Sequence, residues 1–501
     1  MRVAVVLAAA SLSGFLLWLA SPAVGVGWLA WIALVPVASA ALMGSRLAVP
    51  LAYTVYLELS LVRSLPFGLA HDQWADPVVP VLIADSPVVL AAVAVGLFGA
   101  VLYAVRFPLL RARPEGVRAV LVPALAWTAL DLLRVKFDPS GLWGPLFLSQ
   151  AETPAARAAG LVGPWLLTFL VVATAFSIGL FVVRRDVRPA LGVAGALAVV
   201  AAAAAPLPSG GSGTLAVAAV QPGYDTAEFD LPVLHYLRKR YRNHELATRD
   251  LIRDLAPLTR AAAAEGARIV IWPEATAWVD PRTTPSTRAL LTGLARETGA
   301  ALVVPYFFRE RGEGATVVVL PGGAITAPQP KRRPMWFVDE RAGPLEPARP
   351  VGVGPVVLGT LLGVDNQDPA VPRRLVAADA ELLTASMHDW DELAPQQRAF
   401  SRLHAAALGV PLVRADWRFG SAVYGPDGSV VADAAPGKRR AVVVGTVRSA
   451  AARPYAWIGD VFGWAALAGA LVFALPAVQT PKERRLTAPR ARLAKLSWRR
   501  S

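Results

Sequence analysis

Cysteine is absent from the 501 residues of this chain. This excludes disulfide bonds, thiolate zinc sites, iron–sulfur clusters and every mechanism that begins with a cysteine nucleophile. Charge is also scarce, at 17% of residues, against about 25% in ordinary soluble domains. Hydrophobic residues make up 55%, and the mean hydropathy is +0.47. This composition is not that of a purely soluble protein.

Long apolar runs predict about eight membrane spans, because a helix needs about twenty apolar residues to cross a bilayer. The first run resembles a signal peptide, but further apolar runs follow it at once, so we expect a span there too. The eight runs lie near residues 3–20, 24–43, 46–66, 78–105, 117–134, 158–183, 188–206 and 456–478.

Basic residues in the short loops orient these spans, because Lys and Arg stay on the cytoplasmic side. The loops after the second, fourth and sixth spans carry Arg, whereas the loop after the third has acids and no Lys or Arg. We therefore expect a multi-pass protein of the cell membrane with both termini cytoplasmic. The excess of 50 Lys and Arg over 36 Asp and Glu then reflects topology and anionic lipid, and no nucleic-acid partner is expected.

The pattern divides the chain into five parts. Residues 1–206 form a membrane domain with spans 1 to 7, and residues 207–213 form a Gly/Ser/Pro-rich linker. Residues 214–448 alternate short β-branched runs with helical ones, which predicts an extracytoplasmic α/β domain with layered sheets. Residues 449–480 hold the last span, and residues 481–501 form a basic cytoplasmic tail with eight Lys or Arg and one acid.

Three motifs of this α/β domain carry candidate chemistry. Glu274 follows the apolar run Ile271–Pro273, and strand ends in α/β folds commonly present functional groups. A Glu at such a place is, however, more often a helix start or a surface residue. Lys331 lies in a Pro-flanked basic turn, which alone indicates a solvated loop. His388 and Asp389 follow a strand as a ligand or acid/base pair, with a structural turn as the more ordinary interpretation.

Metal and cofactor chemistry is not expected. No two of the five histidines have the spacing of a zinc protease motif. Gly211–Gly213 lacks the flanking residues of a serine nucleophile elbow. We therefore predict a site without metal or cofactor.

The order of the parts resembles apolipoprotein N-acyltransferase, the membrane-bound branch of the nitrilase or carbon-nitrogen hydrolase superfamily. The resemblance covers nearly the whole chain. Each matching stretch is weak alone, and their order together with the topology is what carries the resemblance. The stretches are Trp28–Pro36, Trp127–Arg134, Gly160–Trp165, Gln221–Pro222, Trp272–Glu274 and Pro411–Ala415.

This resemblance implies a nitrilase-like αββα sandwich with a Glu, Lys and Cys triad. In the family, Glu is the general base, Lys stabilises the oxyanion, and Cys attacks a phospholipid ester to form a thioester. The amine of a diacylglyceryl-modified lipoprotein then takes the acyl chain. Glu274 matches the base and Lys331 matches the lysine.

The nucleophile position has no thiol. Anchoring the family segment on Gly359 and Pro369 places Gly363 at the nucleophile and Asp365 at a second acid. A register shifted by two residues places Asp365 at the nucleophile instead. Ser386 lies on a neighbouring strand rather than on the nucleophile turn, so it offers no replacement.

Further positions are implied to contact substrate. Phe229 occupies what resembles a Trp position in the first loop of the α/β domain, and Asp339 or Glu340 occupies the place of an acid in the loop after Lys331. Trp390, next to Asp389, is a further substrate-binding candidate. The segment Asp416–Arg418 departs from the family, which has small and amide residues ending in Asn-Thr there.

Loss of the nucleophile from a cooperating triad lowers turnover by about a millionfold. We therefore expect a degenerate family member, a pseudoenzyme that keeps phospholipid and lipoprotein binding while N-acylation is lost or very weak. The alternative is a non-catalytic membrane protein that binds lipoproteins or scaffolds another envelope enzyme. Some actinobacterial relatives in the family that this chain resembles are fused to, or partner with, a polyprenyl-phosphate mannose synthase, and the Ala- and Arg-rich composition suggests a GC-rich organism of that kind. A transporter is less favoured, because no inverted repeat is visible.

Overall fold

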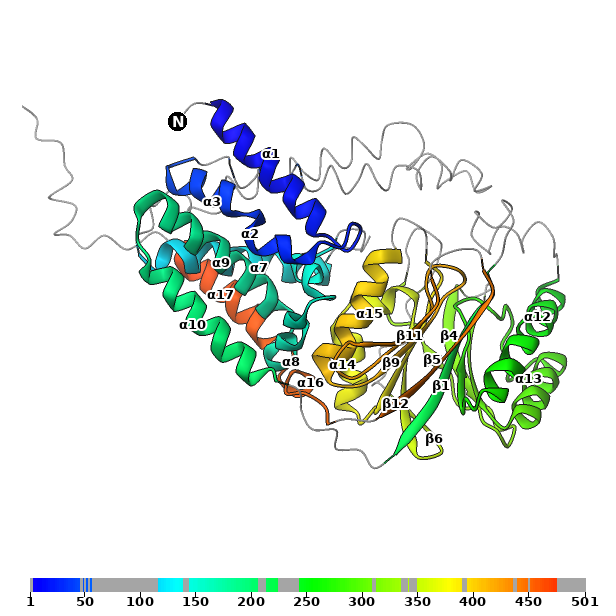
Figure 1. Ribbon diagram of the computed structural model, residues 1–501. Helices are drawn as coiled ribbons and strands as arrows, with labels where there is room; N and C mark the ends of the chain where they lie inside the picture. Colours follow the sequence, from blue (N-terminus) through cyan, green and yellow to red (C-terminus); the bar gives the residue numbers. More distant parts are fainter. Residues whose placement is uncertain are drawn as a thin grey trace, which may run out of the picture.

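The computed structural model consists of a helical bundle beside a layered α/β body (Figure 1). The description covers residues 3–45, 48, 51–52, 55, 116–137, 144–205, 213–223, 243–308, 312–334, 341, 349–389, 394–435, 439–448 and 451–474.

The bundle is built from both ends of the chain. The C-terminal helix α17 packs against α7 through small side chains, among them Ala126, Ala129 and Ala470, which allow the two helices to approach closely. The elements of the bundle are α1 (Val3–Ala20), η1 (Gly27–Leu29), α2 (Ala30–Ala33), α3 (Val35–Leu42), α7 (Arg118–Phe137), η4 (Leu146–Gln150), η5 (Pro154–Ala158), α8 (Ala159–Val162), α9 (Trp165–Arg184), α10 (Arg188–Ala203), α16 (Tyr455–Ile458) and α17 (Val461–Ala474).

The prediction of about eight spans is not confirmed. Among the described residues, two helices are long and apolar enough to cross a membrane, α1 and α9. The run at 24–43 is divided into η1, α2 and α3, and α10 and α17 are shorter apolar helices. Helix α7 has 20 residues but carries Asp131, Arg134 and Lys136 near its end. The run at 78–105 and most of the run at 46–66 lie outside the described residues.

Two six-stranded sheets form the α/β body, as the alternating pattern predicted. The first has the order β12-β1-β2-β3-β4-β5 and the second β11-β10-β9-β8-β7-β6. The strands are β1 (Thr214–Gln221), β2 (Ile269–Ile271), β3 (Ala301–Phe308), β4 (Glu313–Val319), β5 (Gln329–Pro330), β6 (Val351–Val353), β7 (Val356–Leu362), β8 (Leu382–Ser386), β9 (Leu412–Ala415), β10 (Ala422–Tyr424), β11 (Val430–Asp433) and β12 (Ala441–Arg448).

Helices cover the outer face of each sheet, so the layers are αββα (Figure 1). Helices α12 (His244–Ala264) and α13 (Pro285–Thr298) cover the first sheet. Helices α14 (Ala370–Ala377) and α15 (Ala394–Leu408) cover the second sheet on the side that faces the bundle. This arrangement confirms the expected nitrilase-like domain with two sheets.

Strand alternation separates two kinds of core. Along β7, Leu358 faces the other sheet, whereas Leu361 faces the helices α14 and α15. Ile271 of β2 and Val413 of β9 join Leu358 between the sheets, and all three are fully buried. Parallel strands buried on both faces are the reason why these segments read as continuous apolar runs in the sequence.

Polar contacts join the bundle to the α/β body near the end of α7. The ammonium of Lys136 lies 3.1 Å from an oxygen of Asp368 and 2.9 Å from an oxygen of Asp460. Asp368 follows the short helix η8 (Gly363–Gln367), and Asp460 precedes α17. One side chain of α7 therefore ties together the turn after β7 and the C-terminal helix.

We expect Leu358→Ala to destabilise the protein by about 2–5 kcal/mol, because it leaves a cavity between the two sheets. Thermal unfolding of the detergent-solubilised full chain would measure this. Val430→Ala on the edge strand β11 is the control, since Val430 is 45% exposed. Equal unfolding temperatures for the two variants would contradict the assignment of Leu358 to the core.

Candidate functional site

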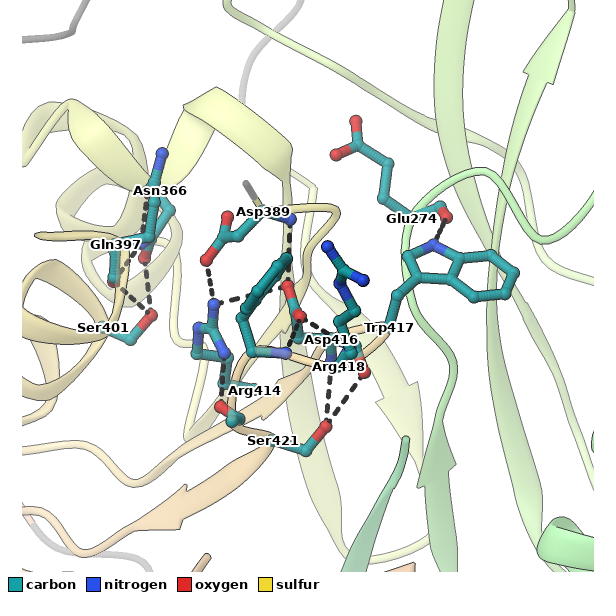
Figure 2. Close-up of polar contacts among 12 residues, drawn as sticks. Glu274, Asn366, Asp389, Gln397, Ser401, Arg414, Asp416, Trp417, Arg418 and Ser421 are labelled. Carbon is teal, nitrogen blue, oxygen red and sulfur yellow. Dashed lines mark hydrogen bonds and ion pairs between the residues drawn. The ribbon is translucent and has the colours of Figure 1, made fainter. Parts of the chain in front are cut away.

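Glu274 lies at the end of β2, where the chain leaves the sheet and turns sharply. Its backbone N–H donates to the carbonyl of Met387, at 3.2 Å. Its own carbonyl accepts a hydrogen bond of 2.7 Å from the indole Nε1 of Trp417 (Figure 2). The next residue, Ala275, has a φ of +59°, which is uncommon for a residue with a side chain. The backbone of Glu274 is therefore held on both sides.

Lys331 brings a cation to Glu274 from the edge strand β5 of the same sheet. It follows the short strand β5, and its backbone N–H donates to the carbonyl of Gly314 at 2.8 Å. Its Nζ lies 2.9 Å from Oε1 of Glu274, and the two side chains are 3% and 15% exposed. A charge this deeply buried requires a partner, because desolvation of a lone ammonium is costly. The solvated loop that the local sequence alone indicates is therefore wrong for Lys331 itself.

Gly363 lies directly beside this ion pair. It follows β7 with a φ of +52°, a conformation that glycine adopts without steric cost. A Cβ atom added at this residue would lie 2.5 Å from Oε2 and 2.6 Å from Oε1 of Glu274. The carboxylate of Glu274 thus fills the space that a side chain at position 363 would need.

Asp365 is used to hold the turn that carries Lys331. Its Oδ1 accepts hydrogen bonds from the backbone N–H groups of Arg332 and Arg333, at 2.9 and 2.7 Å. Its Oδ2 lies 3.1 Å from the same nitrogen of Arg332. Burial raises the pKa of Asp365 to about 7, although these hydrogen bonds and Lys331 act in the opposite direction. Both oxygens therefore face the backbone of the Lys331 turn.

A cluster of buried charges supports the other side of the site (Figure 2). Arg414 of β9 forms a close ion pair with Asp389 and lies 3.4 Å from Asp416. Burial raises the pKa of Asp389 well above its usual value, and neighbouring Asp416 adds to this effect while Arg414 opposes it. Oδ2 of Asp416 also accepts the backbone N–H of Asp389, at 3.0 Å. Asp389 is therefore part of a structural turn.

His388 precedes this cluster and packs its ring against Trp417, with 6.2 Å between ring centroids. Burial lowers the pKa of His388 to about 4, with Asp416 opposing the shift and the cations Arg418 and Lys331 adding to it. The imidazole is therefore neutral near pH 7. Within the described ranges, no group of three or more acidic or histidine side chains is arranged to hold a metal ion.

The structure brings together Glu274, Lys331, Gly363 and Asp365, the four positions proposed for the triad region. The proposed substrate-binding residues lie outside the described residues, and these are Phe229, Asp339, Glu340 and Trp390. Ser386 of β8 is buried, and its hydroxyl makes no hydrogen bond, to Glu274 or to any other residue that the structure describes.

Sequence reasoning missed the role of Trp417, whose indole contacts Glu274 from a different sheet. The signal available was the departure of Asp416–Arg418 from the family pattern. That signal marked the segment as unusual, but it did not indicate which residue the indole would contact.

Asp365→Asn should change the pH dependence of stability. Because the folded pKa of Asp365 is about 7 and its ordinary value is 3.8, the folded state binds the extra proton. The contribution of Asp365 to wild-type stability therefore falls by about 1.4 kcal/mol per pH unit as the pH rises through this window. Asn keeps one acceptor oxygen and does not titrate.

We therefore expect the stability of the variant relative to the wild type to rise between pH 5 and pH 7. Unfolding temperatures at the two pH values measure the difference. Comparing the two proteins at each pH cancels the contribution of His388, whose lowered pKa acts with the opposite sign. A pH-independent difference would contradict the burial of an ionisable Asp365.

Comparison with known proteins adds two matches that follow one another along the chain. The apolipoprotein N-acyltransferase N-terminal domain matches residues 13–177, and the carbon-nitrogen hydrolase family matches residues 216–456. A search of curated proteins finds no match.

Solved structures similar to this chain include two forms of an amidase from Nesterenkonia sp. AN1. A mutant with acrylamide added at its active-site cysteine is 19% identical, with a TM-score of 0.38, and the match covers 46% of this chain and 92% of that one. A mutant with its cysteine replaced by serine, of the nitrilase superfamily, is also 19% identical with a TM-score of 0.38, over 49% and 94%. With the two domain matches in this order, the chain resembles apolipoprotein N-acyltransferase, the membrane-bound branch of the carbon-nitrogen hydrolase superfamily, and it lacks the catalytic cysteine.

Proposed function

We propose that the protein is a degenerate apolipoprotein N-acyltransferase that has lost N-acylation or retains it only very weakly. The observation that carries this proposal is the geometry at Gly363. Glu274 occupies the position of the base, and Lys331 occupies that of the oxyanion-stabilising cation. Nζ of Lys331 lies 2.9 Å from Oε1 of Glu274. The carboxylate lies where the nucleophile would begin. The site thus keeps the supporting groups of an acyl transfer and lacks the atom that forms the acyl-enzyme.

The chemistry of the family explains why this loss is severe. A thiol beside Glu274 would give its proton to the carboxylate as the sulfur attacks an ester carbonyl. The oxygen of that carbonyl would take up negative charge beside Lys331, which would lower the barrier. In this chain Glu274 and Lys331 neutralise each other instead. Without a covalent step, the acyl chain has no intermediate from which a lipoprotein amine could take it.

Asp365 is a poor substitute for the nucleophile. A carboxylate would have to form an acyl anhydride, and it is a weak partner for transfer from an ester. Both of its oxygens also lie within 3.1 Å of backbone N–H groups of the Lys331 turn. The interpretation with Gly363 at the nucleophile position and Asp365 as a second acid agrees better with these contacts.

The proposed location is the cell membrane, with the αββα domain outside and both termini in the cytoplasm. The helices α1 and α9 support membrane attachment by their length and composition, and the basic loops support the orientation. Phospholipid and lipoproteins are the proposed partners. The contacts at the end of α7 support this location, because they join the Lys331 turn to the bundle, from which lipid substrates would be reached.

The second candidate is a non-catalytic protein that binds lipoproteins or scaffolds an envelope enzyme. The closed ion pair at Gly363 is compatible with this role, because binding needs no nucleophile. A polyprenyl-phosphate mannose synthase has no support from the comparisons as a partner. Affinity capture of the tagged full chain that recovers neither lipoproteins nor envelope enzymes would count against scaffolding.

We expect the unmodified chain to yield no triacylated lipoprotein in cells depleted of their own N-acyltransferase, because the nucleophile is missing. Gly363→Cys should yield an acylated enzyme that is visible as a mass increase on the intact protein. Ser386→Cys is the matched control, since it adds a thiol on the neighbouring strand β8, where the Ser386 hydroxyl makes no hydrogen bond to Glu274.

Mass spectrometry of a lipoprotein N-terminus measures the transfer itself. Robust triacylation by the unmodified sequence would refute the loss of activity. Acylation of the Ser386→Cys variant to the same extent would show that the position of the thiol is not what matters.

A further inference from the structure

The backbone beside Glu274 is held in an uncommon conformation. Ala275 has a φ of +59° and is buried. A residue with a side chain persists in this region only when its surroundings enforce it, and such residues cluster at functional sites. The peptide bond that joins Glu274 to Ala275 therefore needs a restraint.

That restraint comes from the other sheet. The indole Nε1 of Trp417 donates to the carbonyl of Glu274, which belongs to this same peptide bond, at 2.7 Å (Figure 2). Trp417 is 3% exposed, so the hydrogen bond is shielded from water. The indole thus donates to the carbonyl of Glu274, and the carbonyl of Met387 accepts the N–H of Glu274. Both polar backbone groups of Glu274 are therefore hydrogen-bonded.

Trp417 is itself fixed by the turn that carries it. Its backbone carbonyl accepts a hydrogen bond of 2.9 Å from Gly223. Oδ1 of Asp416 accepts the backbone N–H groups of Arg418 and Phe419, at 3.0 and 2.6 Å. The β9–β10 turn therefore fixes the backbone of Trp417 independently of the hydrogen bond between the indole and Glu274.

We propose that Trp417 is a positioning residue whose indole holds the strained peptide after Glu274, so that the carboxylate stays over residue 363. The proposal rests on the function proposed for Glu274, the base position of the site. It goes further by assigning that placement to a residue in the segment where the chain departs from its family.

The absence of cysteine provides a clean probe. Gly363→Cys introduces the single thiol of the full chain, and its alkylation by iodoacetamide can be followed by intact mass as a function of pH. A carboxylate beside a thiol raises the thiol pKa, because two like charges oppose each other. The midpoint pH of alkylation therefore reports how close the carboxylate of Glu274 stays once it has moved to admit the new side chain.

In this background, Glu274→Gln should lower the midpoint by about one pH unit. Trp417→Phe should lower it in the same direction, with about a threefold or larger rise in the alkylation rate at a pH well below the midpoint, where each pH unit corresponds to a tenfold change in thiolate. Trp272→Phe is the matched control. Its indole is also buried and donates a hydrogen bond, but to Thr259 at 3.1 Å and not to Glu274.

Rescue distinguishes positioning from general stability. Ala275→Gly should restore the midpoint in the Trp417→Phe variant, because glycine adopts a positive φ without restraint. If Glu274→Gln shifts the midpoint and Trp417→Phe leaves it unchanged, the positioning role of Trp417 would be overturned, while the placement of Glu274 would stand. No shift with Glu274→Gln would overturn the placement of the base as well, and with it the proposed site.

A second measurement avoids the introduced thiol, in case Gly363→Cys does not fold. Hydrogen exchange of the full chain, read by mass spectrometry, should show about tenfold faster exchange in residues 273–278 of Trp417→Phe, because local opening becomes easier. Exchange in β1 should stay unchanged. Equal exchange of residues 273–278 in the variant and the wild type would overturn the proposal.

Discussion

The buried ion pair between Glu274 and Lys331 is the contact on which the site depends. Its two side chains come from the ends of different strands, and neither charge could be buried alone without a large desolvation cost. Gly363 allows the pair to close, because it has no side chain and accepts a positive φ. The absence of cysteine at this position therefore also changes which groups fill the space around it. In its absence Glu274 and Lys331 form an ion pair beside Gly363, the position that we propose for the nucleophile.

This pair is held from both layers of the sandwich and from the helical bundle. Asp365 binds the backbone of the Lys331 turn, and the guanidinium of Arg333 reaches the carbonyl of Val135 near the end of α7, at 3.1 Å. Lys136 of α7 binds Asp368 on the other side of the turn after β7. The Lys331 turn and the turn after β7 thus both contact the end of α7. These contacts couple the geometry of the site to the bundle.

Much of the α/β half could be predicted from the sequence. Buried parallel strands read as apolar runs, and Glu274 stands at the end of one of them, where functional groups of α/β folds gather. The helical half was harder, because hydropathy measures composition and not helix length. Residues 24–43 are apolar throughout but form three short helices, with Pro36 near the start of the third. The burial of Lys331 was also hidden, because its partner lies 57 residues away.

By itself, the sequence determined the composition of a membrane protein, the alternating strands and helices, and the lack of any thiol, because each is a property of residue type or local order. It left two registers open for the nucleophile. Only the tertiary structure decided that Gly363 touches Glu274 while Asp365 faces the Lys331 turn. It also brought Trp417 to the carbonyl of Glu274. The physical reason is that these contacts join strands of two sheets, and pairing across a sandwich depends on packing that no local pattern encodes.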